Sequence, residues 1–270
     1  MRCERTQLHH ARATYVNPRY PKAASLLASP PRTFAAITPR NARLSEEQTL
    51  TTGIDKLDKL VQLVTGQFVG FHSYPSSRSL PELLCVRAQL APPTGLNSDA
   101  VFVDGGNSFH AYAVSNHAIE HGVEPESALS RIHISRAFTY FQLASLLTER
   151  LPRALKHYKS KFVVVSEMTE LFQDPEIKDR EEAYRVFRHV LRSLSATAEI
   201  TGSLVIATSC RQYIKPFHAA FMQAAHAAIL AEDQDAFTQL TLAHHKSLPH
   251  RKVLYREDRP DQLLDDYLEA

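Results

Sequence analysis

The sequence predicts an α/β fold with a mainly parallel sheet, flanked by helices and closed by antiparallel strands. Short apolar runs, 101–104 and 162–165 among them, have the length and composition of buried strands. They alternate along the chain with longer stretches such as 180–200, in which apolar residues recur at helical spacing. Strands that alternate with helices in this way form parallel sheets covered by helices. A chain of 270 residues, 44% hydrophobic and 22% charged, suits one substantial domain with appendages.

The elements follow in order from this periodicity. We expect strands over 67–72, 101–104, 131–135, 162–165 and 203–208, and helices over 80–90, 109–121, 140–158 and 180–200. The helix over 140–158, for example, follows from apolar residues spaced three or four apart at Phe141, Ala144, Leu147, Leu151 and Leu155. Three later apolar runs, 227–231, 237–243 and 252–255, are expected to close the sheet as antiparallel strands.

Charge and proline divide the chain into three parts: a basic arm or linker (1–47), a core domain (48–256) and an acidic tail (257–270). Residues 1–44 hold eight Lys and Arg against the single acid Glu4, while the tail holds six acids against Arg259. A basic arm commonly meets nucleic acid or an acidic partner. A solvated disordered segment and an organelle transit peptide are the alternatives for the same composition.

Cysteine and histidine usage predicts no metal site and no cofactor. Cys3, Cys85 and Cys210 form no CxxC pair, and scattered lone cysteines favour a reducing interior. The 14 histidines show no ligand spacing, so we interpret them as solvated side chains. No apolar run reaches about eighteen residues, the length of a membrane span. The expected location is cytoplasm or nucleoid, or the nucleus of a eukaryote.

The segment between the first expected strand and helix has the position of a phosphate-binding loop without its residues. A working loop reads G-x-x-x-x-G-K-[ST], in which the glycines admit phosphates, the Lys contacts them and the hydroxyl holds Mg²⁺. Here Ser73 and Arg78 take the glycine positions, Ser79 the Lys position and Leu80 the hydroxyl position. Ordinary phosphate chemistry is therefore not expected at this loop.

Five segments in the right order resemble the RecA-like recombinases, specifically the archaeal RadA type and its paralogs. They are TTGIDKLDKL at 51–60, VFVDGGNSF at 101–109, ISRAF at 134–138, VVVSEMT at 163–169 and KSLP at 246–249. They are similar to the opening T-T-G-x-x-x-L-D-x-L of that ATPase core, its I-D-T-E-N-T-F, its V-A-R-A-F, its Walker B strand I-I-V-D-S-L-T and its S-P-x-L-P region. The resemblance runs from about Thr49 to Tyr255 and implies a RecA-like core.

The departures from the family pattern predict a pseudo-ATPase. The family's catalytic Glu falls on Gly106 and its Mg²⁺-linked Asp falls on Ser166, while Ser209-Cys210 replaces its Asn-Gln. Glu167 is expected to face away from the site, because successive strand residues point to opposite faces. Phosphoryl transfer depends on positioning and charge stabilisation. We therefore expect no ATP hydrolysis and little ATP binding. Arg78 either grips a phosphate or fills the vacated pocket, pairing with Asp104 or Glu167.

The second DNA-binding loop of the family corresponds to residues 209–218. Arg211 and Lys215 interleave there with Tyr213 and Phe217, and cations with aromatic side chains are what single-strand binding uses. Alternatively the two aromatic residues belong to the core and the cations to the ordinary surface. The first DNA loop corresponds to 173–182, where five acids make a poor phosphate surface.

The basic arm contains a counterpart of the Phe-x-x-Ala segment through which RadA-type protomers dock. Phe34 supplies the anchor and Ile37 replaces the final Ala. A Phe in a partner's pocket fits the chemistry of interface hot spots, although the arm could equally fold back on its own domain. The family's N-terminal helix-hairpin-helix domain has no evident counterpart in 1–44.

The sequence thus predicts a non-catalytic recombinase paralog that assists homologous recombination, binding single-stranded DNA and an active recombinase or another paralog in an oligomer. The alternatives are an interaction platform without DNA contact, and an enzyme with a rebuilt nucleotide site.

Overall fold

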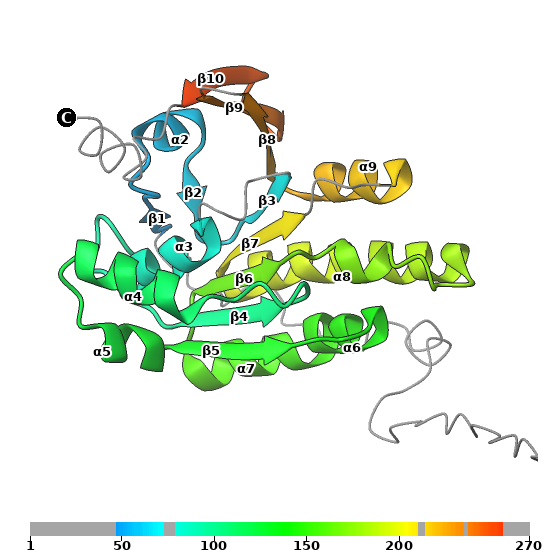
Figure 1. Ribbon diagram of the computed structural model, residues 1–270, viewed down its shortest axis with the longest axis horizontal. Helices are drawn as coiled ribbons and strands as arrows, with labels where there is room; N and C mark the ends of the chain where they lie inside the picture. The colour runs from blue at the N-terminus through cyan, green and yellow to red at the C-terminus, as the bar shows by residue number, and fades with distance from the viewer. Residues whose placement is uncertain (1–46, 73–78, 210–213, 235–236, 256–270) are drawn as a thin grey trace, which may run out of the picture.

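The computed structural model describes residues 47–72, 79–209, 214–234 and 237–255. An eight-stranded sheet in the order β10-β9-β8-β3-β7-β6-β4-β5 forms its centre (Figure 1). Its strands are β3 (Phe68–His72), β4 (Ala100–Asp104), β5 (Ile132–Arg136), β6 (Phe162–Ser166), β7 (Leu204–Ser209), β8 (Ala227–Gln234), β9 (Phe237–His245) and β10 (Arg251–Tyr255). A separate antiparallel pair joins β1 (Thr49–Leu50) to β2 (Leu63–Val64). The predicted α/β class with a mainly parallel sheet is confirmed.

Six strands, β8 and β3 to β7, run parallel, and β9 and β10 add antiparallel pairs at one side. The expectation that all three closing strands are antiparallel is therefore wrong for β8, which pairs parallel with β3 and antiparallel with β9. β8 is reached from β7 through helix α9 (Lys215–Ala224), and a helical crossover returns the chain in the parallel sense.

Alternating strand residues divide the core into two layers. On β6, Phe162 and Val164 join one cluster with helices α2 (Asp55–Leu60), α3 (Leu80–Gln89), α4 (Ala111–Glu120) and α5 (Pro125–Ser130). Val163 and Val165 join the other with α6 (Tyr140–Ser145), α7 (Leu151–Tyr158), α8 (Arg180–Thr201) and α9. Because both faces are covered, the inner parallel strands β3, β4, β6 and β7 are buried along their length and mostly apolar, whereas the edge strand β5 is largely exposed.

The helix expected over 140–158 is present but changes its winding in the middle. A π-helical segment, η2 (Leu146–Arg150), lies between α6 and α7. Pro152 in the first turn of α7 has no N–H, and its ring would collide with the carbonyl of Thr148 in a regular α-helix. The wider turn absorbs this conflict, and the three segments continue one another.

Both ends of α8 are set by local sequence. The Asp179 side chain accepts the backbone N–H of Glu182 at the start, and Gly202 ends the helix with a left-handed φ of 64°. Figure 1 shows α8 and α9 extending past the arrowheads of β6 and β7, beyond the carboxyl edge of the sheet. Helix α9 was not expected, since residues up to 218 were interpreted as loop.

Candidate nucleotide site and neighbouring nucleic-acid segment

The ends of four strands define the candidate site. Four strands lie side by side in the parallel sheet, in the order β3-β7-β6-β4. They end at His72, Ser209, Ser166 and Asp104, respectively. Parallel strands bring these ends to one edge, where ligands of open α/β sheets bind. The loop that follows β3 includes Ser73 and Arg78, which lie outside the described residues.

Ser79, at the Lys position of the phosphate-loop pattern, is bound to a histidine. It precedes α3 in a left-handed conformation (φ 40°), and its Oγ lies 2.7 Å from Nε2 of His117. His117 Nδ1 lies 3.0 Å from Oε2 of Glu120. Since an ionised carboxylate only accepts, His117 Nδ1 donates to Glu120, and Nε2 is the ring nitrogen paired with the Ser79 hydroxyl. The position thus holds an engaged hydroxyl in place of a permanent cation.

Asp104 at the end of β4 is the buried anchor of the site. Its carboxylate accepts from Ser166 Oγ at 3.1 Å, from the Ser108 backbone N–H at 2.9 Å and from Arg136 Nε at 3.1 Å. Ser108 Oγ lies 2.9 Å from Ser166 Oγ. Ser166, at the position of the Mg²⁺-linked Asp, therefore supplies a hydroxyl to a structural network and no second carboxylate.

The space beside Gly106, where the family pattern has its catalytic Glu, is occupied by other side chains. A Cβ at Gly106 would lie 2.5 Å from Glu167 Cβ and 2.6 Å from Glu170 Oε2. Any larger residue at 106 thus requires a shift of its neighbours.

The expectation that Glu167 faces away from the site is wrong. β6 ends at Ser166, and Glu167 follows with a left-handed φ of 48°, which turns its side chain against Gly106. Strand alternation does not apply to a residue beyond the strand end. Burial, followed by the charges of Glu170 and Asp104, raises the pKa of Glu167 to about 7. Its Oε2 is buried and has no hydrogen-bond partner among the described residues.

A buried histidine connects the end of β3 to the segment after β7. His72 is 2% exposed, its Nδ1 lies 2.7 Å from Ser209 Oγ, and its ring contacts that of His218 on α9 at 4.0 Å between centroids. Burial, with the neighbouring His218, lowers the pKa of His72 to about 4. The interpretation of the histidines as solvated is wrong for His72. Its place at the end of an apolar strand was the available signal.

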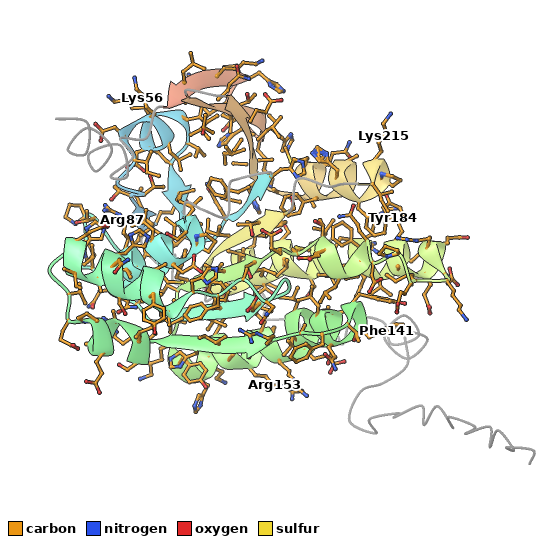
Figure 2. All side chains as sticks on the ribbon, viewed as in Figure 1. Lys56, Arg87, Phe141, Arg153, Tyr184 and Lys215 are labelled. Atoms are coloured by element: carbon orange, nitrogen blue, oxygen red, sulfur yellow. The ribbon has the colours of Figure 1, made fainter. Side chains whose placement is uncertain are left out.

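The nucleic-acid segment is partly core. Lys215 is exposed at the start of α9, whereas Phe217 is 3% exposed and its ring packs against those of Tyr184 and Phe187 on α8. Figure 2 shows Lys215 pointing outward and Tyr184 on the neighbouring helix. The stacking role expected for Phe217 is therefore wrong, and its core alternative is confirmed. Arg211 and Tyr213, like Phe34 and Ile37, lie outside the described residues.

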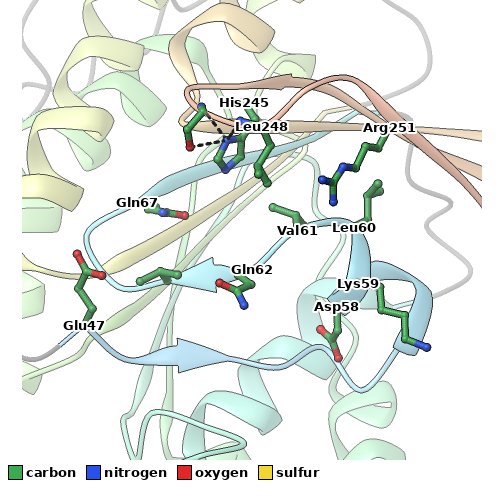
Figure 3. Close-up of a pocket in the computed structure, with 12 residues that line it drawn as sticks. Glu47, Asp58, Lys59, Leu60, Val61, Gln62, Gln67, His245, Leu248 and Arg251 are labelled. Atoms are coloured by element: carbon green, nitrogen blue, oxygen red, sulfur yellow. Dashed lines mark hydrogen bonds between the residues drawn. The ribbon is translucent and has the colours of Figure 1, made fainter.

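A hollow of about 610 Å³ lies at the opposite edge of the sheet (Figure 3). It is lined by Leu60 and Val61 at the end of α2, by Gln67 before β3, by His245 at the end of β9 and by Leu248 between β9 and β10. Gln67 precedes the amino end of β3, whereas the phosphate-loop position follows its carboxyl end. This hollow is therefore separate from the candidate nucleotide site.

Fold, strand order and the residues at the carboxyl edge define a RecA-like recombinase domain. The sequence model of the Rad51 family matches residues 43–234, and the chain belongs to that family. Membership assigns the chain to recombination and DNA repair. Within the described ranges, no helix is long and apolar enough to cross a membrane. The same ranges contain no group of three or more His, Cys, Asp or Glu arranged to hold a metal.

Proposed function

We propose that this protein is a non-catalytic member of the Rad51 family, an accessory to an active recombinase in homologous recombination. It binds DNA, the active recombinase or both, and does not hydrolyse ATP. It acts in the cytoplasm or nucleoid, or in the nucleus of a eukaryote. Its partners are single-stranded DNA and an active recombinase or another paralog, within an oligomer. The docking segment is the arm around Phe34 and Ile37.

The occupied space beside Gly106 is the observation that carries the proposal. Catalysis of phosphoryl transfer needs a group that orients water, a metal ligand and a cation on the phosphates. The three corresponding positions hold Gly106, Ser166 and Ser79, and the last two hydroxyls are engaged by Asp104 and His117. Glu167 lies close to where a catalytic Glu would act, but among the described residues the positions of the metal ligand and of the phosphate cation hold Ser166 and Ser79, which can fill neither role.

The experiment is fluorescence anisotropy with labelled single-stranded DNA, at low and moderate salt, with and without Mg-ATP. Wild type is compared with Lys215→Ala and with the control Lys252→Ala, which removes an exposed cation from β10. We expect salt-sensitive binding that is indifferent to ATP and weaker in Lys215→Ala alone, because displaced counterions set the salt dependence. ATP-dependent binding would contradict the proposal.

An ATPase measurement separates the proposal from an enzyme with a rebuilt site. We expect no turnover above the background of a preparation that lacks the protein. Turnover that disappears in Glu167→Ala would overturn the non-catalytic assignment and identify Glu167 as the replacement for the family's Glu.

The second candidate is an interaction platform without DNA contact. The burial of Phe217 favours it, because one of the two aromatic side chains expected to stack on bases belongs to the core. Binding of an active recombinase together with no DNA binding at any salt concentration would support this platform.

A further inference from the structure

Two helical stretches, one on each face of the sheet, differ in the sign of their charge. Residues 105–130, which include α4 and α5 on one face, contain Glu120, Glu124 and Glu126 and no Lys or Arg. On the other face, residues 183–198 of α8 contain three Arg and no acid. The acids of α8 are confined to its ends, with Glu181 and Glu182 in the first turn and Glu199 near the last. One face thus offers a cationic helix surface.

Arg185, Arg188 and Arg192 form this surface, which we call the arginine stripe. All three are exposed, and spacings of three and four residues place them along one side of α8. The opposite side of the helix is buried through Ala183, Val186, Phe187 and Val190. The stripe therefore faces outward, away from the sheet.

The cations of the stripe are not neutralised within the described part of the chain. None of the three forms an ion pair there, and Arg192 Nε donates to the backbone carbonyl of Arg188. Like charges three and four residues apart on a helix repel each other and weaken it. The charge of Arg192 also contributes, after burial, to the lowered pKa of His189 one turn away. A bound polyanion would offset this repulsion.

The chemistry of the stripe favours a nucleic-acid backbone over a protein. Protein interfaces depend on buried aromatic or apolar anchors. The only exposed large apolar side chain on α8 is Ile200, beyond Glu199 at the far end. Guanidinium groups, in contrast, match phosphate oxygens with two parallel hydrogen bonds. A surface of Arg without apolar anchors is suited to repeated phosphates.

The absence of an exposed aromatic residue on the stripe further favours a duplex over a single strand. Single-strand binding adds base stacking on aromatic side chains, and the nearest aromatic residues on α8, Tyr184 and Phe187, pack against Phe217. A helix rise of 1.5 Å per residue places Arg185 and Arg192 about 10 Å apart. That span corresponds to about three base-pair steps of 3.4 Å along a duplex.

We propose that the arginine stripe of α8 binds the phosphate backbone of double-stranded nucleic acid, as a second surface distinct from the segment around Lys215. The inference rests on the proposed function only in taking nucleic acid as a ligand. Helices α8 and α9 are packed together through Tyr184 and Phe217, so both surfaces belong to one rigid pair of helices. The pair could then hold a duplex beside a single strand.

The test compares Arg185→Ala/Arg188→Ala/Arg192→Ala with wild type in the full chain. Anisotropy is measured with a labelled duplex and with a single strand of the same length, over a range of salt. The control Lys56→Ala/Lys59→Ala/Lys252→Ala removes the same charge from exposed positions on other elements. A Lys-substituted stripe, Arg185→Lys/Arg188→Lys/Arg192→Lys, keeps the charge, and circular dichroism checks that each variant is folded.

We expect the alanine stripe to weaken duplex binding by roughly tenfold or more, while single-strand binding changes little. The slope of the logarithm of the binding constant against the logarithm of salt concentration should become less steep by about 0.9 for each lost phosphate contact. The control should bind as wild type, and the lysine stripe should retain most of the affinity. Equal losses in stripe and control would show that only net charge matters, and would overturn the inference.

Other outcomes separate this inference from the proposed function. Unchanged duplex binding in the alanine stripe, with single-strand binding lost in Lys215→Ala, would overturn the stripe and leave the proposed function standing. Absence of binding to either nucleic acid would overturn the stripe and the DNA-binding part of the proposed function, and would leave the interaction platform. If wild type bound no duplex but bound a poly-glutamate peptide through the stripe, an acidic protein segment would replace nucleic acid as its ligand.

Discussion

The two edges of the central sheet differ in how their carboxylates are paired. At the amino edge, Asp99 before β4 accepts from Arg131 Nε at 2.8 Å and pairs with His133 Nε2 at 3.1 Å. Burial alone would raise the pKa of Asp99, and the bonds from Arg131 and His133 outweigh it, so that this pKa is lowered. At the carboxyl edge, burial raises the pKa of Glu167, and no partner contacts its Oε2.

This difference shows which edge is arranged for stability and which retains the geometry of a site. At the amino edge the polar groups around Asp99 are paired: Ser160 Oγ donates to the Asp99 carbonyl, and Ser98 Oγ accepts from the Lys161 N–H. The carboxyl edge brings Asp104, Glu167 and Glu170 close together with Arg136 as the cation bound to Asp104. Crowded carboxylates are typical of functional sites when their pKa values are raised, as those of Glu167 and Glu170 are here.

The largest expected loss of stability comes from Phe217→Ala, which tests whether α9 belongs to the core at the carboxyl edge. Phe217→Ala should lower the free energy of unfolding by about 3–5 kcal/mol, because it empties a fully buried aromatic position. Chemical denaturation measures the change, and single-strand binding is measured on the folded fraction. A variant of unchanged stability that has lost DNA binding would contradict the buried position and restore Phe217 as a contact residue.

Glu167→Gln tests the strain at the carboxyl edge. The pKa of Glu167 is about 7 in the folded protein, against an ordinary value of 4.5. Folding therefore favours the protonated form, and the stability present below about pH 4.5 is lost as pH rises towards 7. Gln cannot ionise, so the variant should be more stable than wild type at pH 8, by up to about 3 kcal/mol.

The measurement is urea denaturation at pH 5 and pH 8, with the exposed Glu126→Gln as control. The gain should be confined to Glu167→Gln and to the higher pH. An equal gain at both pH values would show that the substitution acts through packing, and that the carboxylate of Glu167 is not held under strain.

Gly106→Ala tests whether the neighbouring side chains occupy the position of the family's Glu. The added Cβ would lie 2.5 Å from Glu167 Cβ, so we expect a loss of about 1–3 kcal/mol from overpacking. Glu167→Gly removes the colliding atoms at a left-handed position that glycine tolerates. The double variant should thus recover much of the loss, and additive effects in this double-mutant cycle would exclude a direct contact.

The strands and long helices could be predicted because their signals are local. The alternation on β6 and the helical spacing on α8 depend only on which residues face the core. Even the continuity of 140–158 was predicted, and only its π-helical middle, next to Pro152, was not. The parallel course of β8 could not be inferred from its own residues, because direction is fixed by the unpredicted crossover helix α9.

The site was harder to predict, because its contacts join residues distant in the chain. The sequence correctly placed Ser79, Gly106 and Ser166 among the strand ends and beside helix α3. It could not reveal that His117 binds Ser79, or that Ser209 binds His72, since these pairs are 38 and 137 residues apart. Glu167 was misplaced for a local reason: the strand was assumed to continue by one residue, and a left-handed turn reversed the direction of that side chain.

The smallest effect concerns the amino edge. Asp99→Asn keeps the shape of the side chain and removes the charge that Arg131 and His133 bind. Because Asp99 is 30% exposed, solvent screens the pair, and we expect a loss of about 1 kcal/mol at pH 7.

The lowered pKa of Asp99 contributes stability above the unfolded pKa that is lost as pH falls through the folded pKa. At neutral pH the wild type should be more stable than Asp99→Asn and less stable than Glu167→Gln. Both differences in the free energy of unfolding should shrink on acidification. Denaturation of both variants between pH 4 and 8 measures this contrast. If Asp99→Asn were more stable than wild type at pH 7, the two edges would share the same strain, and the distinction between them would not hold.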